Sequence, residues 1–127
     1  MDYKLELIPI PTSDVDRAKA FYKDNCGFHL DHDVHPNEHF RVIQLTPPGS
    51  SCSIAIGKGI IDSPPGSVRG LHLVVPDVQA ASTEMRSRGV DVGEVQDLGG
   101  VLYAWFSDPD GNTWALQEIT PQATRPD

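Results

Sequence analysis

Cysteines and long apolar runs are both scarce in this sequence of 127 residues. Cys26 and Cys52 are too few for a disulfide scaffold, and they lack the spacing of a zinc-binding motif. No run approaches the ~20 apolar residues of a membrane-spanning helix, and Met1 to Lys4 do not start a signal peptide. We therefore expect a cytoplasmic protein with no membrane partner.

Basic residues are scarce as well, with 10 Lys and Arg against 18 Asp and Glu and a formal net charge of −8. Nucleic-acid phosphates require a basic surface, so this balance predicts no nucleic-acid partner. It favours solubility and, more weakly, a neutral or cationic small ligand. The length fits one domain that buries roughly two-thirds of its unfolded surface.

The most informative stretch is Asp108-Pro109-Asp110-Gly111-Asn112, which lies between the apolar runs Val101–Phe106 and Thr113–Ile119. Proline fixes φ and glycine supplies a positive φ, so the stretch predicts the turn of a hairpin. A calcium loop would need glycine in the sixth place and glutamate in the twelfth, whereas this stretch has glycine in the fourth and Ile119 in the twelfth.

Short motifs that mark helix starts, helix ends and turns recur 62 or 63 residues apart in the sequence. Asp14-Val15 corresponds to Asp77-Val78 (77 − 14), Gly27 to Gly89 (89 − 27) and Pro48-Gly49 to Asp110-Gly111 (110 − 48). Three matches in register predict two βαβββ modules within a single domain. Module one covers about 4–57, a linker 58–69, module two about 70–119, and a tail that we expect to fray 120–127.

Each predicted module has one helix and four strands. The helices begin at Ser13 or Asp14 and at Asp77, and end near Gly27 and Gly89. The expected strands are 4–10, 28–34, 40–45 and 52–56, followed by 71–75, 90–95, 101–106 and 113–119. The predicted fold class is α+β: two tandem βαβββ modules that form one curved, eight-stranded mixed sheet with a concave cleft for a small ligand.

The sequence resembles the vicinal oxygen chelate superfamily, which includes glyoxalase I, bleomycin-resistance proteins, fosfomycin-resistance enzymes and extradiol dioxygenases. The resemblance extends from Lys4 to Ile119, and the stretches that carry it are Pro11–Tyr22, Gly27-Phe28, Leu71–Val78 and Phe106–Asn112. It implies the fold given above and a homodimer with clefts at or near the interface.

Superfamily members with metal chemistry hold one divalent ion with a His, Gln or Glu from each of four strands. The resemblance places these four positions on Leu7, Ser53, Gly70 and Ala115. A register slip by one would replace the second position by Ile54. None of these residues is a metal ligand, so we expect no cofactor. The alternative is a displaced divalent metal held by His72, Gln117 and a carboxylate, with Glu118 on the opposite face of its strand.

Alternation along the strands places Tyr103 and Trp105 on one face and Phe106 on the other, with Trp114 on the core side. We expect the two exposed rings to line the cleft, which suits a flat or aromatic ligand, although both could be core residues. His72 could hydrogen-bond a ligand or Gln117, or act as a catalytic acid–base. The predicted ligand-binding residues are Leu7, Ser53, Gly70, His72, Tyr103, Trp105, Ala115 and Gln117.

A second cluster of polar residues is interpreted as an exposed hairpin rim. Its members are His29, His32, His35, His39, Asp31, Asp33 and Glu38. Strand alternation predicts His29, Asp31 and Asp33 on one face and His32 on the other. Near the mouth of the cleft, His39 or Arg41 could contact a ligand.

Three functions are compatible with these observations. The first is a metal-independent protein that binds a small organic molecule, as in the bleomycin-resistance branch. The second is a lyase, isomerase or dioxygenase that uses a displaced metal or His72 as acid–base. The third is an interaction module without a ligand. Turnover of a bound compound would separate the second from the first, and a collapsed cleft would favour the third.

Overall fold

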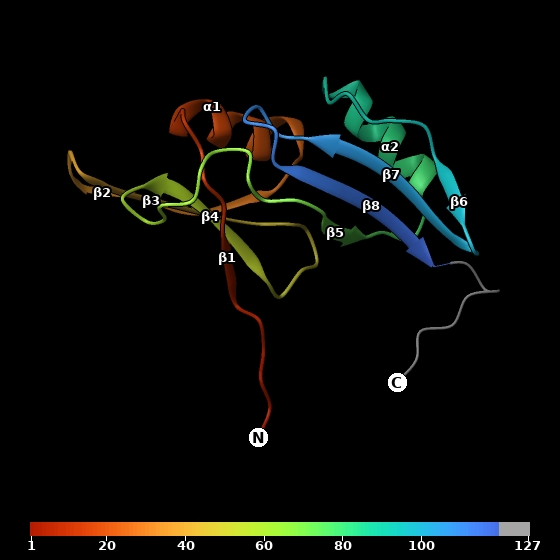
Figure 1. Cartoon of the computed structure of the whole chain (residues 1–127), viewed down its shortest axis with the longest axis horizontal. Coiled ribbons are helices and arrows are strands. Elements are labelled where there is room, and N and C mark those ends of the chain that lie inside the picture. The colour runs from red at the N-terminus through yellow and green to blue at the C-terminus, as the bar shows by residue number, and fades with distance from the viewer. Residues whose placement is uncertain (120–127) are drawn as a thin grey trace.

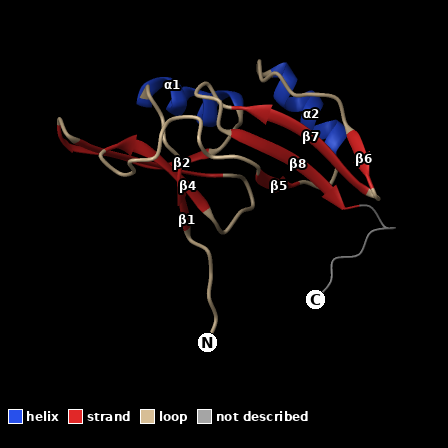
Figure 2. Ribbon diagram, viewed as in Figure 1, coloured by secondary structure: helices blue, strands red, loops and turns tan. Residues whose placement is uncertain are grey.

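The computed structural model describes residues 1–119, and the predicted tail at 120–127 lies outside the described residues. Eight strands form two four-stranded mixed sheets, in the orders β1-β4-β3-β2 and β5-β8-β7-β6. The helices lie on one side of both sheets (Figure 1, Figure 2). The elements are β1 Leu7–Pro9, α1 Val15–Ala20, η1 Phe21–Asn25, β2 His29–Asn37, β3 Phe40–Thr46, β4 Ser53–Lys58, β5 Leu71–Val74, α2 Val78–Ser87, β6 Gln96–Leu98, β7 Val101–Ser107 and β8 Thr113–Ile119.

The two halves have the same pairing, which confirms the predicted α+β fold of two βαβββ modules. β1 runs parallel to β4 and β5 parallel to β8, and the other pairs are antiparallel. The eight predicted strands are thus divided between two hydrogen-bonded sheets. No helix among the described residues has the length and apolar composition needed to cross a membrane.

The helix boundaries follow the predicted caps. The Asp14 side chain accepts a hydrogen bond from the Arg17 backbone N–H at 3.1 Å, and Asp77 accepts one from Ala80 at 3.0 Å. Each bond satisfies a donor that the first turn of a helix leaves free. Beyond α1 the chain continues as a π-helical turn, η1, and Gly27 follows it with φ of 79°. The Cβ of another residue would be strained in this conformation.

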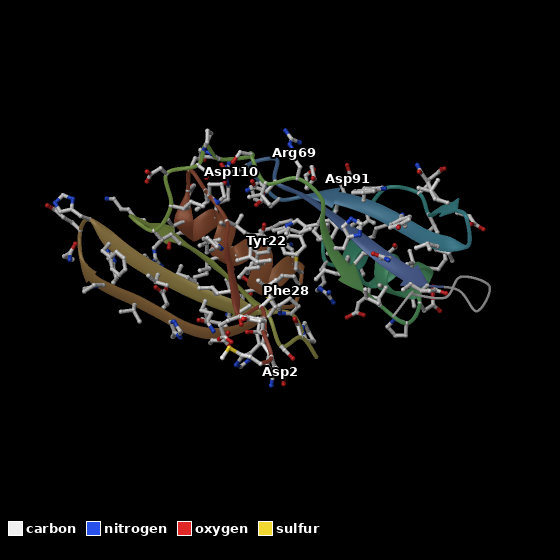
Figure 3. The ribbon with its side chains drawn as sticks, turned by 60° about the horizontal axis from the view of Figure 1, so that its bottom comes forward. Asp2, Tyr22, Phe28, Arg69, Asp91 and Asp110 are labelled. Carbon is white, nitrogen blue, oxygen red and sulfur yellow. The ribbon has the colours of Figure 1, made fainter. Side chains whose placement is uncertain are left out.

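A shared aromatic core joins the modules. Tyr22 and Phe28 of module one stack with ring centroids 5.7 Å apart, and both contact Trp114 of module two. Figure 3 shows Tyr22 and Phe28 side by side near the middle of the molecule. Trp114 also stacks on Phe106 at 6.1 Å, and all four rings are buried. The predicted core positions of Phe106 and Trp114 are therefore confirmed.

The predicted turn between β7 and β8 is held by its own polar groups. The buried Asp108 carboxylate accepts hydrogen bonds from the backbone N–H of Asp110 at 3.0 Å and of Asn112 at 2.9 Å. It also accepts one from the Tyr22 hydroxyl at 2.6 Å. These donors occupy the oxygens that a calcium loop would need for its ion.

The turn also contacts module one through the side chain of Asp110. Asp110 accepts hydrogen bonds from the hydroxyls of Thr12 and Ser13 and lies 3.5 Å from the Arg17 guanidinium. Burial opposes ionisation of this carboxyl, but the hydrogen bonds from Ser13 and Thr12 outweigh it, so the pKa of Asp110 is lowered. The turn therefore ties β8 to the start of α1.

The predicted strand at 90–95 is wrong, because β6 covers only Gln96–Leu98. The Arg86 guanidinium donates to the backbone carbonyls of Val92 and Gly93 at 2.9 and 2.7 Å. A side chain thus occupies acceptors that a strand would offer to its neighbour. Val90 and Val92 are buried, so their apolar pattern reflects core packing rather than strand pairing.

The first strand is also shorter than predicted. β1 begins at Leu7, and the preceding residues extend away from the body of the molecule (Figure 1). The side chains of Met1, Tyr3 and Leu5 are 103, 90 and 67% exposed, although they alternate with charged residues as in a half-buried strand. We call Met1–Glu6 the N-terminal arm.

The faces predicted for the β2 hairpin require correction. A register shift between Leu30 and His32 leaves Asp31 on the side of its sheet away from the helices, where it contacts Gln44, and Asp33 on the helix side. There Asp33 accepts two hydrogen bonds from Arg41, at 3.0 and 2.8 Å. Arg41 is therefore held by carboxylates on the helix side rather than at the mouth of a cleft. A β-bulge changes the face of the residues after it, which alternation alone does not predict.

Candidate functional site

The face of β5, β8 and β7 that lies away from the helices brings together five of the residues predicted from sequence. Ala115 is the register partner of both His72 and Trp105, and Gln117 is the partner of Tyr103. Register partners project from the same face of a sheet. We call this surface the open face.

Three rings dominate the open face. Tyr103 and Trp105 are nearly parallel, with an interplanar angle of 20° and centroids 6.0 Å apart. The His72 ring is edge-on to both, at 86° and 85°, with centroid distances of 5.8 and 5.9 Å. Such edge-to-face geometry is favourable between π systems. Trp105 remains 39% exposed, whereas Ala115 is buried.

A hydrogen bond joins the two polar residues of the face. His72 Nδ1 lies 2.8 Å from Gln117 Oε1, so the contact predicted between these side chains is present. Glu118, the next residue on β8, accepts a hydrogen bond from the backbone N–H of Val78 at 2.8 Å. As predicted, Glu118 lies on the helix side, where it satisfies a free donor at the start of α2.

The other sheet carries a polar cluster on its corresponding face. Ser53 is buried, and its hydroxyl lies 2.6 Å from that of Thr46 and 3.4 Å from Gln44 Nε2. Asp31 accepts hydrogen bonds from both Thr46 and Gln44. Leu7 pairs with Ser53 in register. Of these residues, only Ser53 and Leu7 were predicted as site residues. Gln44 and Thr46 could have been identified from their alternation along β3.

Two cavities lie between the modules, and His72 lines both. The smaller, of about 210 Å³, is also lined by Cys52 and Ser53. The larger, of about 410 Å³, lies against α2 and is also lined by Cys26 and Met85. Burial raises the pKa of the Cys26 thiol to about 12, so this thiol is neutral. His72 therefore lies where the open face meets the space between the modules.

Gly70 has a backbone role. It lies just before β5 with φ of 79°, and its N–H lies 2.7 Å from the Thr113 hydroxyl and 3.1 Å from the Thr113 carbonyl oxygen. These bonds fix the start of β5 against β8, which sets the register of His72. Gly70 itself offers no side chain to a ligand.

The residues at the four metal positions do not fit a divalent ion. Leu7, Gly70 and Ala115 have no donor atom in their side chains, and the Ser53 hydroxyl is engaged by Thr46 and Gln44. Within residues 1–119, no three or more His, Cys, Asp or Glu side chains are grouped so that they could hold a metal. A displaced site at His72 would also lack Glu118, which faces the helix. That no metal is resident stays a prediction.

Comparison with known proteins places this geometry in a family. The family model of the Glyoxalase/Bleomycin resistance protein/Dioxygenase superfamily matches residues 4–116. The chain belongs to this superfamily. The resemblance read from the turn, cap and core residues is thereby confirmed. No curated protein sequence matches the chain.

Several solved structures of this superfamily resemble the chain closely. TnmS3, an antibiotic binding protein from Streptomyces sp. CB03234, is 36% identical with a TM-score of 0.83, over 94% of this chain and 98% of that one. A glyoxalase/bleomycin resistance protein from the same organism is 38% identical with a TM-score of 0.77, over 89% and 98%. A superfamily member from Sphaerobacter thermophilus DSM 20745 is 29% identical with a TM-score of 0.80, over 92% and 98%.

Proposed function

We propose that this superfamily member binds a small, partly aromatic organic molecule on its open face, without a resident metal and as a homodimer. The observation that carries the proposal is the group of rings formed by His72, Tyr103 and Trp105, with centroids 5.8–6.0 Å apart. His72 and Trp105 are exposed and Tyr103 is half-buried, whereas aromatic side chains of a folded chain are normally buried, as Trp114 is. This group of rings offers a flat ligand a stacking surface.

The polar groups of the face are few and uncharged. Gln117 Nε2, the Tyr103 hydroxyl and Trp105 Nε1 have no hydrogen-bond partner among the described residues, so they are free to orient a ligand. The outward-facing positions of β5, β7 and β8 carry no Lys, Arg, Asp or Glu. Apolar walls with a few directed polar groups are typical of small-molecule sites. The face therefore suits a neutral planar molecule.

The relatives support binding rather than a particular reaction. TnmS3, 36% identical over 94% of this chain, is described as an antibiotic binding protein. The misfit of the four metal positions argues against a Lewis acid at the place where a metal enzyme of this superfamily would hold it. Sequestration of a compound needs only the stacking surface and its polar groups.

Exposed apolar surface supports the homodimer. On the sheet of the open face, Val74 is 60% and Leu98 56% exposed, and the N-terminal arm exposes Tyr3 and Leu5. Exposed apolar side chains of this kind commonly mark an interface. Because each copy carries both these strand residues and the N-terminal arm, a two-fold dimer would cover these side chains reciprocally.

Tryptophan fluorescence offers a direct test. Trp114 is buried and Trp105 is exposed, so a compound stacking on the open face should quench Trp105 selectively. A panel of planar aromatic compounds would be screened by quenching, and affinities then measured by calorimetry. We expect Trp105→Ala to weaken binding about tenfold, since loss of a stacking ring removes about 0.5–1.5 kcal/mol in addition to the apolar area that it buries, and ~1.4 kcal/mol is a factor of ten.

The matched control is Phe40→Ala, which removes a ring that is also 39% exposed but lies on β3. Equal weakening by both variants would contradict the proposed location. Bound compounds would also be recovered and analysed by mass spectrometry. Conversion of a compound that stops in His72→Ala would establish the enzyme alternative in place of simple binding.

A further inference from the structure

We infer that Gln117 holds His72 in one tautomer, so that the open face presents His72 Nε2 as a hydrogen-bond acceptor and selects ligands that carry a hydroxyl or N–H group. Gln117 is then a positioning residue, and His72 is the residue that accepts the hydrogen bond from the ligand. The tautomer follows from the contact between the two side chains. The selection of a ligand rests in addition on the proposed function.

The argument starts from the 2.8 Å distance between His72 Nδ1 and Gln117 Oε1. An amide oxygen can only accept, so Nδ1 must carry the proton of this hydrogen bond. A neutral imidazole has one ring proton, which leaves Nε2 with an unshared lone pair. The identity of one atom on Gln117 therefore decides the hydrogen-bonding character of the far side of the His72 ring.

The ring is held in this orientation by its neighbours. The rings of Tyr103 and Trp105 on β7 lie perpendicular to it, and Gln117 holds it from β8. Its strand is fixed in register through the pairs His72–Ala115 and Val74–Gln117. A ring held by three side chains from two strands presents Nε2 in a defined direction, which selection of a ligand requires.

Nε2 is free to meet a ligand. No described residue forms a hydrogen bond with it, the His72 side chain is exposed, and His72 lines both cavities between the modules. The charged residues that line the larger cavity, Glu84 and Arg88, are paired with each other at 2.8 Å. They therefore do not compete for Nε2 as donors or as counter-ions.

The consequence is a preference between otherwise similar ligands. A phenolic hydroxyl can donate to Nε2, whereas the corresponding methyl ether leaves the lone pair without a partner once the ligand has displaced water. An unsatisfied acceptor of this kind weakens binding by about tenfold or more. Replacement of Gln117 by an apolar residue should reduce the preference, because both tautomers then become available: the ether oxygen can accept from Nε2–H in one, and the phenol must first select the other.

The first experiment measures the tautomer without a ligand. The ¹⁵N-labelled protein is observed by NMR above the pH at which its five histidines are protonated, and the His72 signals are assigned by their loss in His72→Gln. We expect a protonated Nδ1 and an unprotonated Nε2 in the wild type and in Gln117→Glu, whose carboxylate also accepts. Gln117→Leu should show a mixture. A wild-type ring protonated at Nε2 would overturn the inference.

The second experiment measures selection with 2-naphthol and 2-methoxynaphthalene. The wild type should bind the naphthol about tenfold more tightly or better, and Gln117→Leu should show a clearly smaller preference while melting at the wild-type temperature. Gln117→Glu should restore the preference. Equal wild-type affinities would refute the selection and leave the proposed function standing. Binding of neither compound would count against the aromatic ligand and the selection together, and the tautomer measured by NMR would show which step of the argument failed.

Discussion

The hydroxyl of Tyr22 offers the sharpest test of how the two modules are joined. It donates to the Asp108 carboxylate at 2.6 Å and accepts from Trp114 Nε1 at 3.0 Å, so one atom of module one connects two residues of module two. Burial, reinforced by the charge of Asp108, raises the pKa of Tyr22 far above its ordinary value. The hydroxyl therefore stays protonated and remains a donor. Tyr22→Phe removes this oxygen and nothing else.

The expected cost follows from the two groups left behind. A hydrogen bond to a carboxylate contributes about 1.5–3 kcal/mol, and a buried N–H without an acceptor costs about 1–3 kcal/mol. Asn112 Nδ2 still donates to Asp108 at 2.8 Å, which reduces the loss at the carboxylate. We therefore expect Tyr22→Phe to lower the free energy of unfolding by about 3 kcal/mol. For a chain of this length, that lowers Tm by roughly 10 °C.

The measurement is urea unfolding at pH 7, followed by circular dichroism and by fluorescence of the buried Trp114. Tyr3→Phe is the matched control, because Tyr3 is 90% exposed, and it should change the free energy by less than ~0.5 kcal/mol. If Tyr22→Phe proved as stable as Tyr3→Phe, the network would not hold the modules together. A separate unfolding transition for each module in Tyr22→Phe would show that it also supplies their cooperativity.

Three further predictions concern acid stability, thiol reactivity and metal content. Hydrogen bonds from Arg41 lower the pKa of Asp33, and the pKa of Asp110 is lowered as well. The stability these carboxylates give is fully present well above pH ~4, the ordinary carboxyl range, and is lost progressively as pH falls through their lowered folded-state pKa. Asp33→Asn should therefore lower Tm at pH 7 and by less at pH 3, with the difference growing as the pH falls further; a loss that does not change with pH would refute the ion-pair explanation. The half-buried Cys52 should react with iodoacetamide in the folded protein at pH 8. Cys26, whose pKa is raised to about 12 by burial, should react only after unfolding. Labelling of Cys26 before Cys52 would contradict this prediction. Protein purified without chelator should contain less than about a tenth of an equivalent of Mn, Fe, Co, Ni or Zn, with no rise in Tm on their addition, because the family's ligand positions carry no His, Gln or Glu. Stoichiometric metal would restore the displaced-metal alternative.

The accuracy of the sequence-based predictions depends on whether a signal is local. Asp14 and Asp77 cap their helices through backbone groups three residues away, so the cap can be read from a short stretch. The alternation of Tyr103 and Trp105 with Phe106 gave the right faces because β7 is regular along its length. At 90–95 the same reasoning failed, because a guanidinium from α2 takes the carbonyls that pairing would use.

The polar cluster around Ser53 shows a second limit of prediction from sequence. Asp31 reaches Thr46 and Gln44 only because β2 bulges beside it, and nothing in the local composition places the extra residue there. The position of Arg41 is also non-local, since its carboxylate partners come from β2 and α1. Such contacts depend on how strands and helices pack against one another. The alternation of residues within one strand carries no information about that packing.

The sequence by itself determined the duplicated βαβββ pattern, the helix caps, the hairpin turn at Asp108–Asn112 and the absence of His, Gln and Glu at the family's metal positions. These properties reside in residue types and short spacings, which the chain carries before it folds. Only the tertiary structure decided that three rings and Gln117 share one exposed face, that His72 lines both cavities, and that Tyr22 joins the two modules. Those properties arise from strand register and from contacts between residues far apart in the chain, so they exist only once the two sheets have packed around a common core.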